Sequence, residues 1–242
     1  MTTLLRCLLF AAATHAFSPP IRGGSRFFLD TANREEWAEL LPTGIFHGVT
    51  TNPTILQKAN EPCTIKNLHR MMEDCLDEYP VEEFMVQAWG DDLYDCALNL
   101  LDTPVASHIV IKVPVTQQGV SVARKLIQED HRVCLTACYS HKQALLAASV
   151  GAEYLAPYFG RMNDAGMDGY YECLTMLQAV RGMKSSTRIL VASLRDVDSL
   201  VNLALGGLET MTFSPEVARE LFVNDMTDQA AKDFEQAATD NQ

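Results

Sequence analysis

The chain has 242 residues, of which 48% are hydrophobic and 21% are charged, and its formal net charge is −12. A chain of this length and composition can bury one large hydrophobic core in a single domain, and its composition excludes a disordered or fibrous protein. The excess of acidic residues argues against a basic face for nucleic acid. Any anionic ligand must therefore be held by a few local groups.

Residues 1–26 have the pattern of a removable targeting presequence. Met1–Ala16 includes a short apolar run that is too short to span a bilayer as a helix, so no membrane anchor is expected in the mature protein. Phe17–Arg26 carries arginines and serines but no acidic residue, as transit peptides do. The junction between Ala16 and Phe17 resembles the two-part leaders of plastid proteins in algae with secondary plastids. We expect a plastid protein, with the secretory pathway or the cytoplasm as alternatives.

After this leader, short β-branched or aromatic runs alternate with helical segments. The predicted strands are Phe27–Asp30, Gly48–Thr51, Phe84–Ala88, His108–Pro114, Arg132–Cys138, Tyr154–Tyr158, Arg188–Ser193 and Thr210–Ser214. The predicted helices are Arg34–Leu41, Thr64–Tyr79, Asp91–Leu101, Gln117–Glu129, His141–Val150, Met167–Gly182, Val197–Leu205 and Pro215–Phe222.

Eight strand–helix units in series are what a closed parallel (β/α)8 barrel, or TIM barrel, requires. We expect one α/β barrel over residues 27–223, followed by a polar tail helix over residues 224–242. An open doubly wound sheet is the alternative, but no glycine-rich phosphate loop follows the first strand.

The seven cysteines are odd in number and scattered, without a C-x-x-C pair or histidines at zinc spacing. This pattern favours free thiols in a reducing compartment, and no metal site is expected. Cys134 and Cys138 lie four residues apart in a predicted strand, where residues i and i+4 share a face. We therefore expect both of these thiols to pack on the same side of the barrel wall.

One lysine stands in the middle of a β-branched run, His108–Val115. Such a run predicts a strand that is covered on both faces, so Lys112 should be held away from bulk water. Desolvation disfavours an ammonium ion, and a neutral amine can attack a carbonyl to form a Schiff base. The alternative is a lysine whose stem packs while its charged head reaches solvent at the strand end.

In a TIM barrel, chemistry collects at the carboxyl ends of the strands. The residues at these ends are Asp30, Asn52, Gln87, Lys112, Thr136, Tyr158, Ser193 and Ser214. A residue two positions earlier in a strand faces the same side of the barrel. For the strand-end residues Gln87, Lys112, Thr136, Tyr158 and Ser193, the residues two positions earlier are, in the same order, Met85, Val110, Cys134, Ala156 and Val191. Because these five are apolar or nearly so, we expect polar side chains at only one end of the interior.

These side chains suit a Schiff-base aldolase. Tyr158 can move a proton directly, or through a water that Gln87 and Thr136 position. Asp30 can accept hydrogen bonds from substrate hydroxyls, and Asn52 can both donate and accept them. Two residues are candidates to bind a phosphate group. They are Arg161, whose guanidinium lies just beyond the sixth strand, and Ser193, whose hydroxyl lies at the end of the seventh.

Each assignment has a plainer structural alternative. Asp30 could accept backbone donors at a strand end, and Asn52 could serve only as the turn residue before a proline. Tyr158 could fill the core with a satisfied hydroxyl. Arg161 could form a loop ion pair with Asp164.

Five stretches together resemble the transaldolase family, and more narrowly its small fructose-6-phosphate aldolase branch. They are Phe27-Phe-Leu-Asp-Thr-Ala-Asn33, Gly48-Val-Thr-Thr-Asn-Pro-Thr54, Ile111-Lys-Val-Pro-Val-Thr116, Gly151-Ala-Glu-Tyr-Leu-Ala-Pro-Tyr158 with Arg161, and Val191-Ala-Ser-Leu-Arg195. The resemblance covers the chain from about Phe27 to the tail. It implies a (β/α)8 barrel and a Schiff base on Lys112, without a metal or an organic cofactor.

The resemblance also implies roles and an assembly. Asp30 and Asn52 would orient the dihydroxyacetone part of a phosphorylated sugar, and Arg161 with Ser193 would bind its phosphate. The remaining three, which would manage the catalytic water and proton transfer, are Gln87, Thr136 and Tyr158. The tail resembles the family's exchanged C-terminal helix, so we expect a ring-based homo-oligomer such as a decamer.

The choice between branches depends on few residues. Transaldolases usually have Glu, Phe and Asn where this chain has Gln87, Tyr158 and Cys134, whereas the aldolase branch is similar to this chain at Gln87 and Tyr158. Departures from that branch are Leu135, Cys138 and Trp89. We expect reversible cleavage of fructose 6-phosphate to dihydroxyacetone and glyceraldehyde 3-phosphate. The alternatives are transaldolase, which transfers the same three-carbon unit to an aldose phosphate in the pentose phosphate pathway, and a catalytically silent barrel scaffold.

Overall fold

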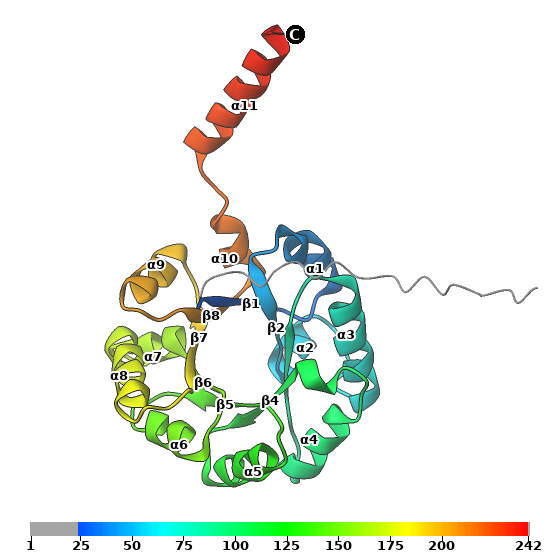
Figure 1. Ribbon diagram of the computed structural model, residues 1–242, viewed down its shortest axis with the longest axis vertical. Helices are drawn as coiled ribbons and strands as arrows, with labels where there is room; N and C mark the ends of the chain where they lie inside the picture. The colour runs from blue at the N-terminus through cyan, green and yellow to red at the C-terminus, as the bar shows by residue number, and fades with distance from the viewer. Residues whose placement is uncertain (1–23, 242) are drawn as a thin grey trace, which may run out of the picture.

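The computed structural model describes residues 24–241, and within them eight parallel strands close into one barrel in sequence order, β1 to β8 (Figure 1). The strands are β1 (Arg26–Asp30), β2 (Phe46–Thr50), β3 (Glu83–Gln87), β4 (Ile109–Pro114), β5 (Val133–Cys138), β6 (Tyr154–Pro157), β7 (Arg188–Leu194) and β8 (Thr210–Phe213). This is a TIM barrel, and the predicted fold class is confirmed. All eight predicted strands are present, with ends that differ by at most two residues.

The helices surround the strands as an outer layer (Figure 1). They are α1 (Arg34–Leu40), α2 (Pro53–Lys58), α3 (Ile65–Glu78), α4 (Leu93–Leu101), α5 (Gln117–Gln128), α6 (Gln143–Val150), α7 (Phe159–Asp164), α8 (Gly169–Gly182), α9 (Val197–Leu205) and α10 (Pro215–Glu220), with 3-10 turns η1 (Leu41–Thr43) and η2 (Ala106–His108). The tail helix α11 (Asp225–Asp240) lies outside this layer. The pattern predicted every helix in this layer except α2 and α7. Both missed helices have six residues and directly follow predicted site residues.

Residues 1–23, most of the predicted presequence, lie outside the described residues. Arg26, which the sequence pattern placed in that presequence, is the first residue of β1. Its guanidinium lies 2.8 Å from a Glu83 carboxylate oxygen. The barrel therefore begins one residue earlier than predicted.

Apolar side chains fill the barrel interior, and on β3, β4, β5 and β6 they include the residues that the period-two pattern predicts. The buried interior cluster is Phe28, Met85, Val110, Cys134, Tyr154, Ala156 and Leu190. A larger second cluster lies between the strands and the surrounding helices, and it includes Trp37, Val49, Ile111 and Met176. Burial on both faces explains why β4 is an uninterrupted β-branched run apart from its lysine.

The amino end of the interior holds a network of charged groups, so the expectation of polar side chains at one end only is wrong. Glu83 is 3% exposed, and its carboxylate lies 2.6 Å from Arg132 Nη2 and 2.8 Å from His47 Nε2. Tyr154 donates a hydrogen bond of 2.7 Å to the other Glu83 oxygen. The sequence pattern did not predict this network because its charged residues lie near the starts of strands, where a charged side chain usually faces solvent.

Two strands break their alternation near the carboxyl end. Ala137 on β5 and Ser193 on β7 have φ values of 56° and 63°, in the left-handed region that non-glycine residues rarely adopt. The register of β5 with β6 shifts between Leu135 and Cys138, and that of β7 with β8 shifts between Val191 and Leu194. A bulge of this kind turns the following side chain to a different face.

Two predictions about facing residues are wrong for this reason. Cys134 lies in the interior cluster, but Cys138 lies in the outer one, with its Sγ 3.9 Å from Met176 Sδ. Val191 likewise packs outward, and Leu190 is the interior residue of β7.

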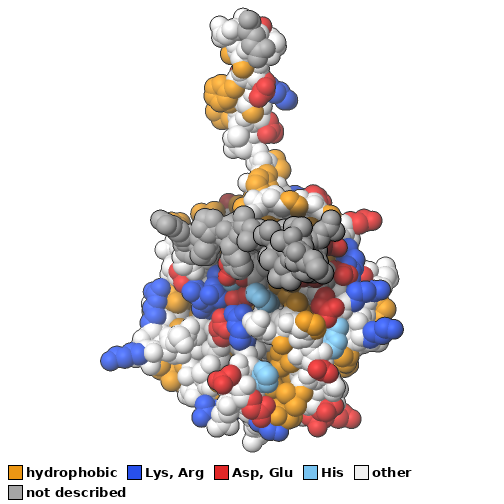
Figure 2. Space-filling view, turned by 45° about the vertical axis from the view of Figure 1, so that its right-hand side comes forward, with side chains coloured by type: hydrophobic (Ala, Val, Ile, Leu, Met, Phe, Trp, Pro, Cys, Tyr) orange, Lys and Arg blue, Asp and Glu red, His pale blue; other side chains and the backbone are white. Residues whose placement is uncertain are grey.

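The tail helix α11 projects away from the barrel (Figure 1). Asn224 caps its first turn by accepting a hydrogen bond from Thr227 N–H, and none of its described residues is buried. Hydrophobic side chains lie along one side of this helix and charged side chains along the other (Figure 2). Met226 and Phe234, eight residues apart, are 84% and 73% exposed. No helix among residues 24–241 is long and apolar enough to span a bilayer.

Candidate active site

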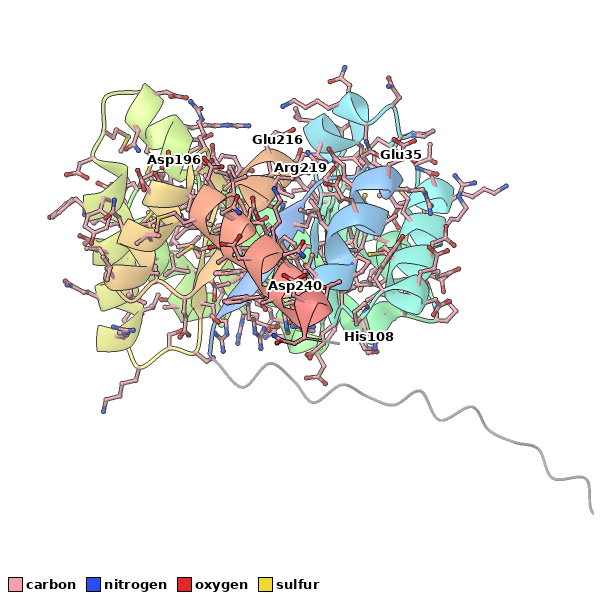
Figure 3. The ribbon with its side chains drawn as sticks, turned by 90° about the horizontal axis from the view of Figure 1, so that it is seen from above. Glu35, His108, Asp196, Glu216, Arg219 and Asp240 are labelled. Carbon is pink, nitrogen blue, oxygen red and sulfur yellow. The ribbon has the colours of Figure 1, made fainter. Side chains whose placement is uncertain are left out.

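A cavity of about 470 Å³ opens at the carboxyl end of the barrel. Figure 3 views the barrel from the side: Glu35, Asp196 and Glu216, which follow β1, β7 and β8, lie at one end, and His108, which precedes β4, lies at the other. Seven of the eight predicted site residues line the cavity: Asp30, Asn52, Lys112, Thr136, Tyr158, Arg161 and Ser193. Residues that are far apart in the sequence thus meet at the end of the barrel where strand-end chemistry was predicted.

Lys112 points into the barrel from β4 and is 4% exposed. Its inward neighbour on the same strand is Val110, a member of the interior cluster. Its ammonium nitrogen donates a hydrogen bond of 3.0 Å to the main-chain carbonyl of Thr51. The lysine is therefore buried and lines the cavity, and its head group does not extend into solvent as the alternative reading required.

Asp30 belongs to a chain of hydroxyl groups from three neighbouring strands. Thr50 Oγ1 donates to Asp30 Oδ1 at 2.5 Å, and Thr212 Oγ1 lies 2.6 Å from Thr50 Oγ1. Because Thr50 has a single hydroxyl proton and gives it to Asp30, Thr212 must be the donor to Thr50. Burial raises the pKa of Asp30, and the nearby charge of Lys112 and the hydrogen bond from Thr50 oppose this shift only in part.

Tyr158 and Thr136 form a second hydroxyl pair on the opposite side of the cavity. Their oxygens are 3.1 Å apart, and Thr136 is 1% exposed. Tyr158 is half-buried and directly follows β6, where it forms an isolated bridge to Ala192 on β7. The phenol therefore borders the cavity and is not core filler, and Thr136 is within hydrogen-bonding distance to orient it.

Arg161 reaches the cavity from α7 and contacts aromatic rings. Its guanidinium carbon lies 4.7 Å from the centre of the Tyr158 ring, and Nη1 donates to the Tyr139 hydroxyl at 3.4 Å. The predicted alternative, an ion pair of Arg161 with Asp164, is wrong, because Asp164 pairs with Arg195 at 2.8 Å. This leaves the Arg161 charge available to an anion in the cavity.

Asn52 begins the short helix α2. Its side-chain oxygen accepts from Ile55 N–H at 3.0 Å, and Pro53 occupies the first helical position, where the missing N–H costs nothing. That oxygen caps the helix, and among the described residues no acceptor is hydrogen-bonded to the Asn52 amide hydrogens. It is thus more than a turn residue, and the predicted acceptor role is already engaged by the backbone.

Ser193 reaches the cavity through its left-handed backbone, against which α7 packs closely. A Cβ atom added at Gly160 would lie 2.3 Å from the Ser193 carbonyl oxygen. Only glycine permits this approach. Gly160 immediately precedes Arg161, so the close packing of α7 on β7 fixes where Arg161 begins.

Gln87 ends β3 beside Lys112, which is its partner in the register of β3 with β4. It is half-buried and is not among the described residues that line the cavity. Its neighbour on the same face, Met85, lies in the interior cluster as predicted.

Sequence reasoning missed several lining residues. Lys58, Arg195 and Glu216 contribute charges at the cavity, and Thr212 contributes a hydroxyl. Lys58 lies on α2, a helix that the sequence pattern did not predict. The Asn-Pro pair before it, a cap residue followed by proline, is the signal that could have found both. Within residues 24–241, no group of three or more His, Cys, Asp or Glu side chains is arranged to hold a metal ion.

Comparison with known proteins identifies the family. The sequence model of the transaldolase/fructose-6-phosphate aldolase family matches residues 27–93 and 90–242. The chain belongs to this family. A protein of Hyphomonas neptunium described as a probable transaldolase is 32% identical over 210 residues, which span 86% of this chain and 94% of that protein. A probable transaldolase of Chelativorans sp. is 32% identical over 209 residues, with the same coverage.

A solved structure supports the fold alone. Thiamine phosphate pyrophosphorylase from Pyrococcus furiosus superposes with a TM-score of 0.58 at 14% identity, covering 81% of this chain and 93% of that one. At this identity the likeness carries no information about the reaction. Membership of the transaldolase/fructose-6-phosphate aldolase family makes the chain one of a group of carbohydrate-metabolising enzymes, whose name covers both transfer and cleavage.

Proposed function

We propose that this chain is a Schiff-base aldolase that reversibly cleaves fructose 6-phosphate to dihydroxyacetone and glyceraldehyde 3-phosphate. The observation that carries the proposal is the burial of Lys112 in a polar cavity that the Tyr158–Thr136 pair also lines, with Thr136 on the strand next to that of the lysine. Among the described lysines, only Lys58 and Lys112 line the cavity, and Lys58 is exposed on α2. A buried amine beside a proton-transfer group is what imine chemistry requires.

The proposed reaction passes through an imine and an enamine on Lys112. The neutral amine of Lys112 adds to the ketose C2 carbonyl, and the resulting carbinolamine takes up one proton and loses water to give a protonated imine; this proton is released again when the imine is hydrolysed. A base removes the proton of the C4 hydroxyl, the C3–C4 bond breaks, and its electron pair moves to the imine as an enamine while glyceraldehyde 3-phosphate leaves. Tyr158 then delivers a proton to C3 through a water beside Thr136. Hydrolysis of the resulting imine releases dihydroxyacetone and restores the amine.

The other cavity residues are proposed to hold the substrate. Asp30 and Asn52 would bind the hydroxyls of the three-carbon unit, as acceptor and donor respectively. Arg161 and Ser193 would bind the phosphate at the other end. Gln87, which neighbours Lys112 in the sheet, would help to position the catalytic water.

Transaldolase is the second candidate, because the relatives from Hyphomonas neptunium and Chelativorans sp. are described as probable transaldolases. The two reactions share every step until the enamine forms. Cleavage then needs a proton at C3, whereas transfer needs an aldose phosphate to capture the enamine. The phenol of Tyr158, 3.1 Å from a second hydroxyl, supports protonation and hence cleavage.

One assay separates these two candidates. The protein is incubated with fructose 6-phosphate, with and without erythrose 4-phosphate, and the products are resolved by chromatography. The aldolase proposal expects dihydroxyacetone without the acceptor. Product that forms only when erythrose 4-phosphate is present would establish transfer and overturn the aldolase proposal.

A chemical test separates both enzymes from a silent scaffold. Borohydride reduces an imine to a stable secondary amine, so treatment with dihydroxyacetone and borohydride should leave a covalent adduct on Lys112. Peptide mass spectrometry locates it. Absence of the adduct in folded protein would support the scaffold and contradict the imine mechanism.

We also propose that the protein is a homo-oligomer in which α11 packs on a neighbouring copy. Its Met226 and Phe234 lie on the apolar side of the helix and are exposed, together with Phe222 and Val223 just before it. An apolar face of this kind is covered in most soluble proteins. Light scattering should give a mass several times 26.8 kDa. A monomer would contradict the proposal.

The destination of the protein is a separate proposal. A plastid location would follow from residues 1–26, and it can be tested with a fluorescent protein fused after residue 26. Fluorescence confined to the plastid would support it, whereas fluorescence throughout the cytoplasm or in secretory compartments would favour the alternatives.

A further inference from the structure

Tyr139 lies next to the cavity, where its hydroxyl contacts Arg161, one of the lining residues. It directly follows β5, two residues after the left-handed Ala137. Its side chain is 36% exposed, but its backbone is fixed: Gln143 Oε1 accepts hydrogen bonds from the N–H groups of Tyr139 at 2.9 Å and Ser140 at 3.1 Å. The residue is thus held in place on a loop that would otherwise be free to move.

The Tyr139 side chain closes a triangle with two proposed site residues. Its hydroxyl accepts the 3.4 Å hydrogen bond from Arg161 Nη1, and its ring meets the Tyr158 ring edge-on, with centres 5.5 Å apart at 73°. The Arg161 guanidinium in turn lies 4.7 Å from the centre of the Tyr158 ring. The cation is therefore held by one hydroxyl and one aromatic face, which come from two different strand ends.

The chemistry of this support differs from that of an ion pair. The hydrogen bond to Tyr139 raises the pKa of Arg161, and no carboxylate is within salt-bridge distance of its guanidinium among the described residues. Asp164, on the same helix, is occupied by Arg195. A phenol fixes the direction of a guanidinium without neutralising its charge, so the remaining N–H donors stay available to an anion.

We propose that Tyr139 is a positioning residue that aims Arg161 at the substrate phosphate, and that it thereby sets the preference for phosphorylated over unphosphorylated aldehydes. This inference rests on the proposed function, in which Arg161 binds the phosphate. It applies to cleavage and to transfer alike, because both use a phosphorylated aldehyde. Tyr139 itself touches Arg161 and need not touch the reacting atoms.

The test compares two aldehydes that differ only in the phosphate. Aldol addition of dihydroxyacetone to glyceraldehyde 3-phosphate and to D-glyceraldehyde is measured for the wild type and for Tyr139→Phe, which removes only the hydroxyl. We expect KM for glyceraldehyde 3-phosphate to rise about three- to tenfold, as for the loss of one hydrogen bond to a charged group, with kcat within about twofold. The kinetics with D-glyceraldehyde should not change.

Two controls make the result specific. Tyr170→Phe alters a tyrosine of similar exposure, 38%, on α8 outside the cavity lining, and should behave as the wild type. In an Arg161→Ala background, Tyr139→Phe should have no further effect on KM, because the residue acts through that guanidinium. Equal losses with both aldehydes, or an undiminished effect in the Arg161→Ala background, would overturn the inference.

Imine trapping separates this inference from the proposed function. Borohydride with dihydroxyacetone is applied to the wild type and to each variant, since formation of this adduct needs no phosphate. If all of them form the adduct and the phosphate-selective loss is missing, only the role of Tyr139 fails. If the wild type forms no adduct, the proposed function fails and the role of Tyr139 falls with it.

Discussion

The two ends of this barrel use charged side chains in opposite ways. At the amino end, Glu83 is enclosed by Arg132, His47 and Tyr154, so each group satisfies another. At the carboxyl end, Lys112 donates only to a main-chain carbonyl in the described structure, and Arg161 rests on aromatic rings. Charges that are matched internally stabilise a fold, whereas charges that keep free hydrogen-bonding capacity are available to a ligand. The comparison predicts that stability and activity can be altered separately, one at each end.

The largest effect is expected from Lys112→Met. Removing the proposed nucleophile should lower the turnover of fructose 6-phosphate by a factor on the order of a thousand or more and abolish borohydride trapping. Because methionine fits the same buried path, we expect the thermal midpoint to stay within about 3 °C of the wild type. Retained turnover would show that another group carries the chemistry.

At the opposite end, Glu83→Gln should destabilise the fold and leave the chemistry intact. Neutralising one member of a buried network leaves its partners with uncompensated charge, which costs about 3 kcal/mol of unfolding free energy. Denaturant titration measures this loss, and kcat per folded molecule should remain within about twofold. Glu82→Gln, whose side chain in the wild type is 51% exposed, is the adjacent control and should change neither quantity.

The same carboxylate predicts how stability depends on pH. Burial acts to raise the pKa of Glu83, but the hydrogen bond from His47 and the charge of Arg132 outweigh it and lower the pKa from 4.5 to about 2. A lowered carboxyl pKa contributes stability that is complete above the unfolded value and is lost as the pH falls toward the folded one. The unfolding free energy should therefore fall between about pH 4.5 and pH 2. Glu83→Gln should flatten that part of the profile.

Two tyrosines on or next to β6 offer a matched pair for the comparison. Tyr158→Phe should lower cleavage about a hundredfold, as expected for loss of a proton-transfer group, and should lower transfer to erythrose 4-phosphate far less. Tyr154→Phe, four residues earlier, should cost about 1 to 2 kcal/mol of stability with little change in kcat, because it removes a buried hydrogen bond to Glu83. Equal losses of cleavage and transfer in Tyr158→Phe would contradict its proposed role.

The smallest effect is expected from Asp30→Asn, and its sign is the informative part. Burial raises the pKa of Asp30, so the ionised carboxylate disfavours the folded state at neutral pH. Removing its charge should therefore stabilise the protein by about 1 kcal/mol at pH 7 while lowering kcat/KM. Thermal and denaturant unfolding at pH 7 provide the measurement. If Asp30→Asn instead destabilised the protein, the Asp30 carboxylate would be a stabilising charge, like Glu83 at the amino end, and the prediction would be wrong.

The barrel and most of its site were predictable because both depend on periodic patterns. β-branched runs indicated the strands, and the period of two placed Val110, Cys134 and Ala156 behind the site residues on the interior face. The closure of parallel strands then brought their carboxyl ends together. These inferences need only the side-chain direction along each strand, which the sequence encodes locally.

The remaining features depend on contacts that no local pattern records. Ala137 and Ser193 adopt a left-handed backbone without being glycine, so nothing in the sequence announces where the alternation breaks. The ionic network joins Arg26, Glu83 and Arg132, residues up to 106 positions apart, each of which looks like a surface charge. Tyr139 was missed because it follows a bulge and therefore lies outside the predicted strand face.

Arg26 has a consequence for how the protein matures. Its guanidinium is 2.8 Å from Glu83 and 3.3 Å from Glu153, so the first residue of the barrel is also a partner in its ionic network. Removal of the whole predicted leader, residues 1–26, would detach this cation and leave two acids short of a counter-charge, so a cut before Arg26 is the one that preserves the network. The folded domain itself thus sets a limit on how far a peptidase can trim the chain without removing a partner of these two acids.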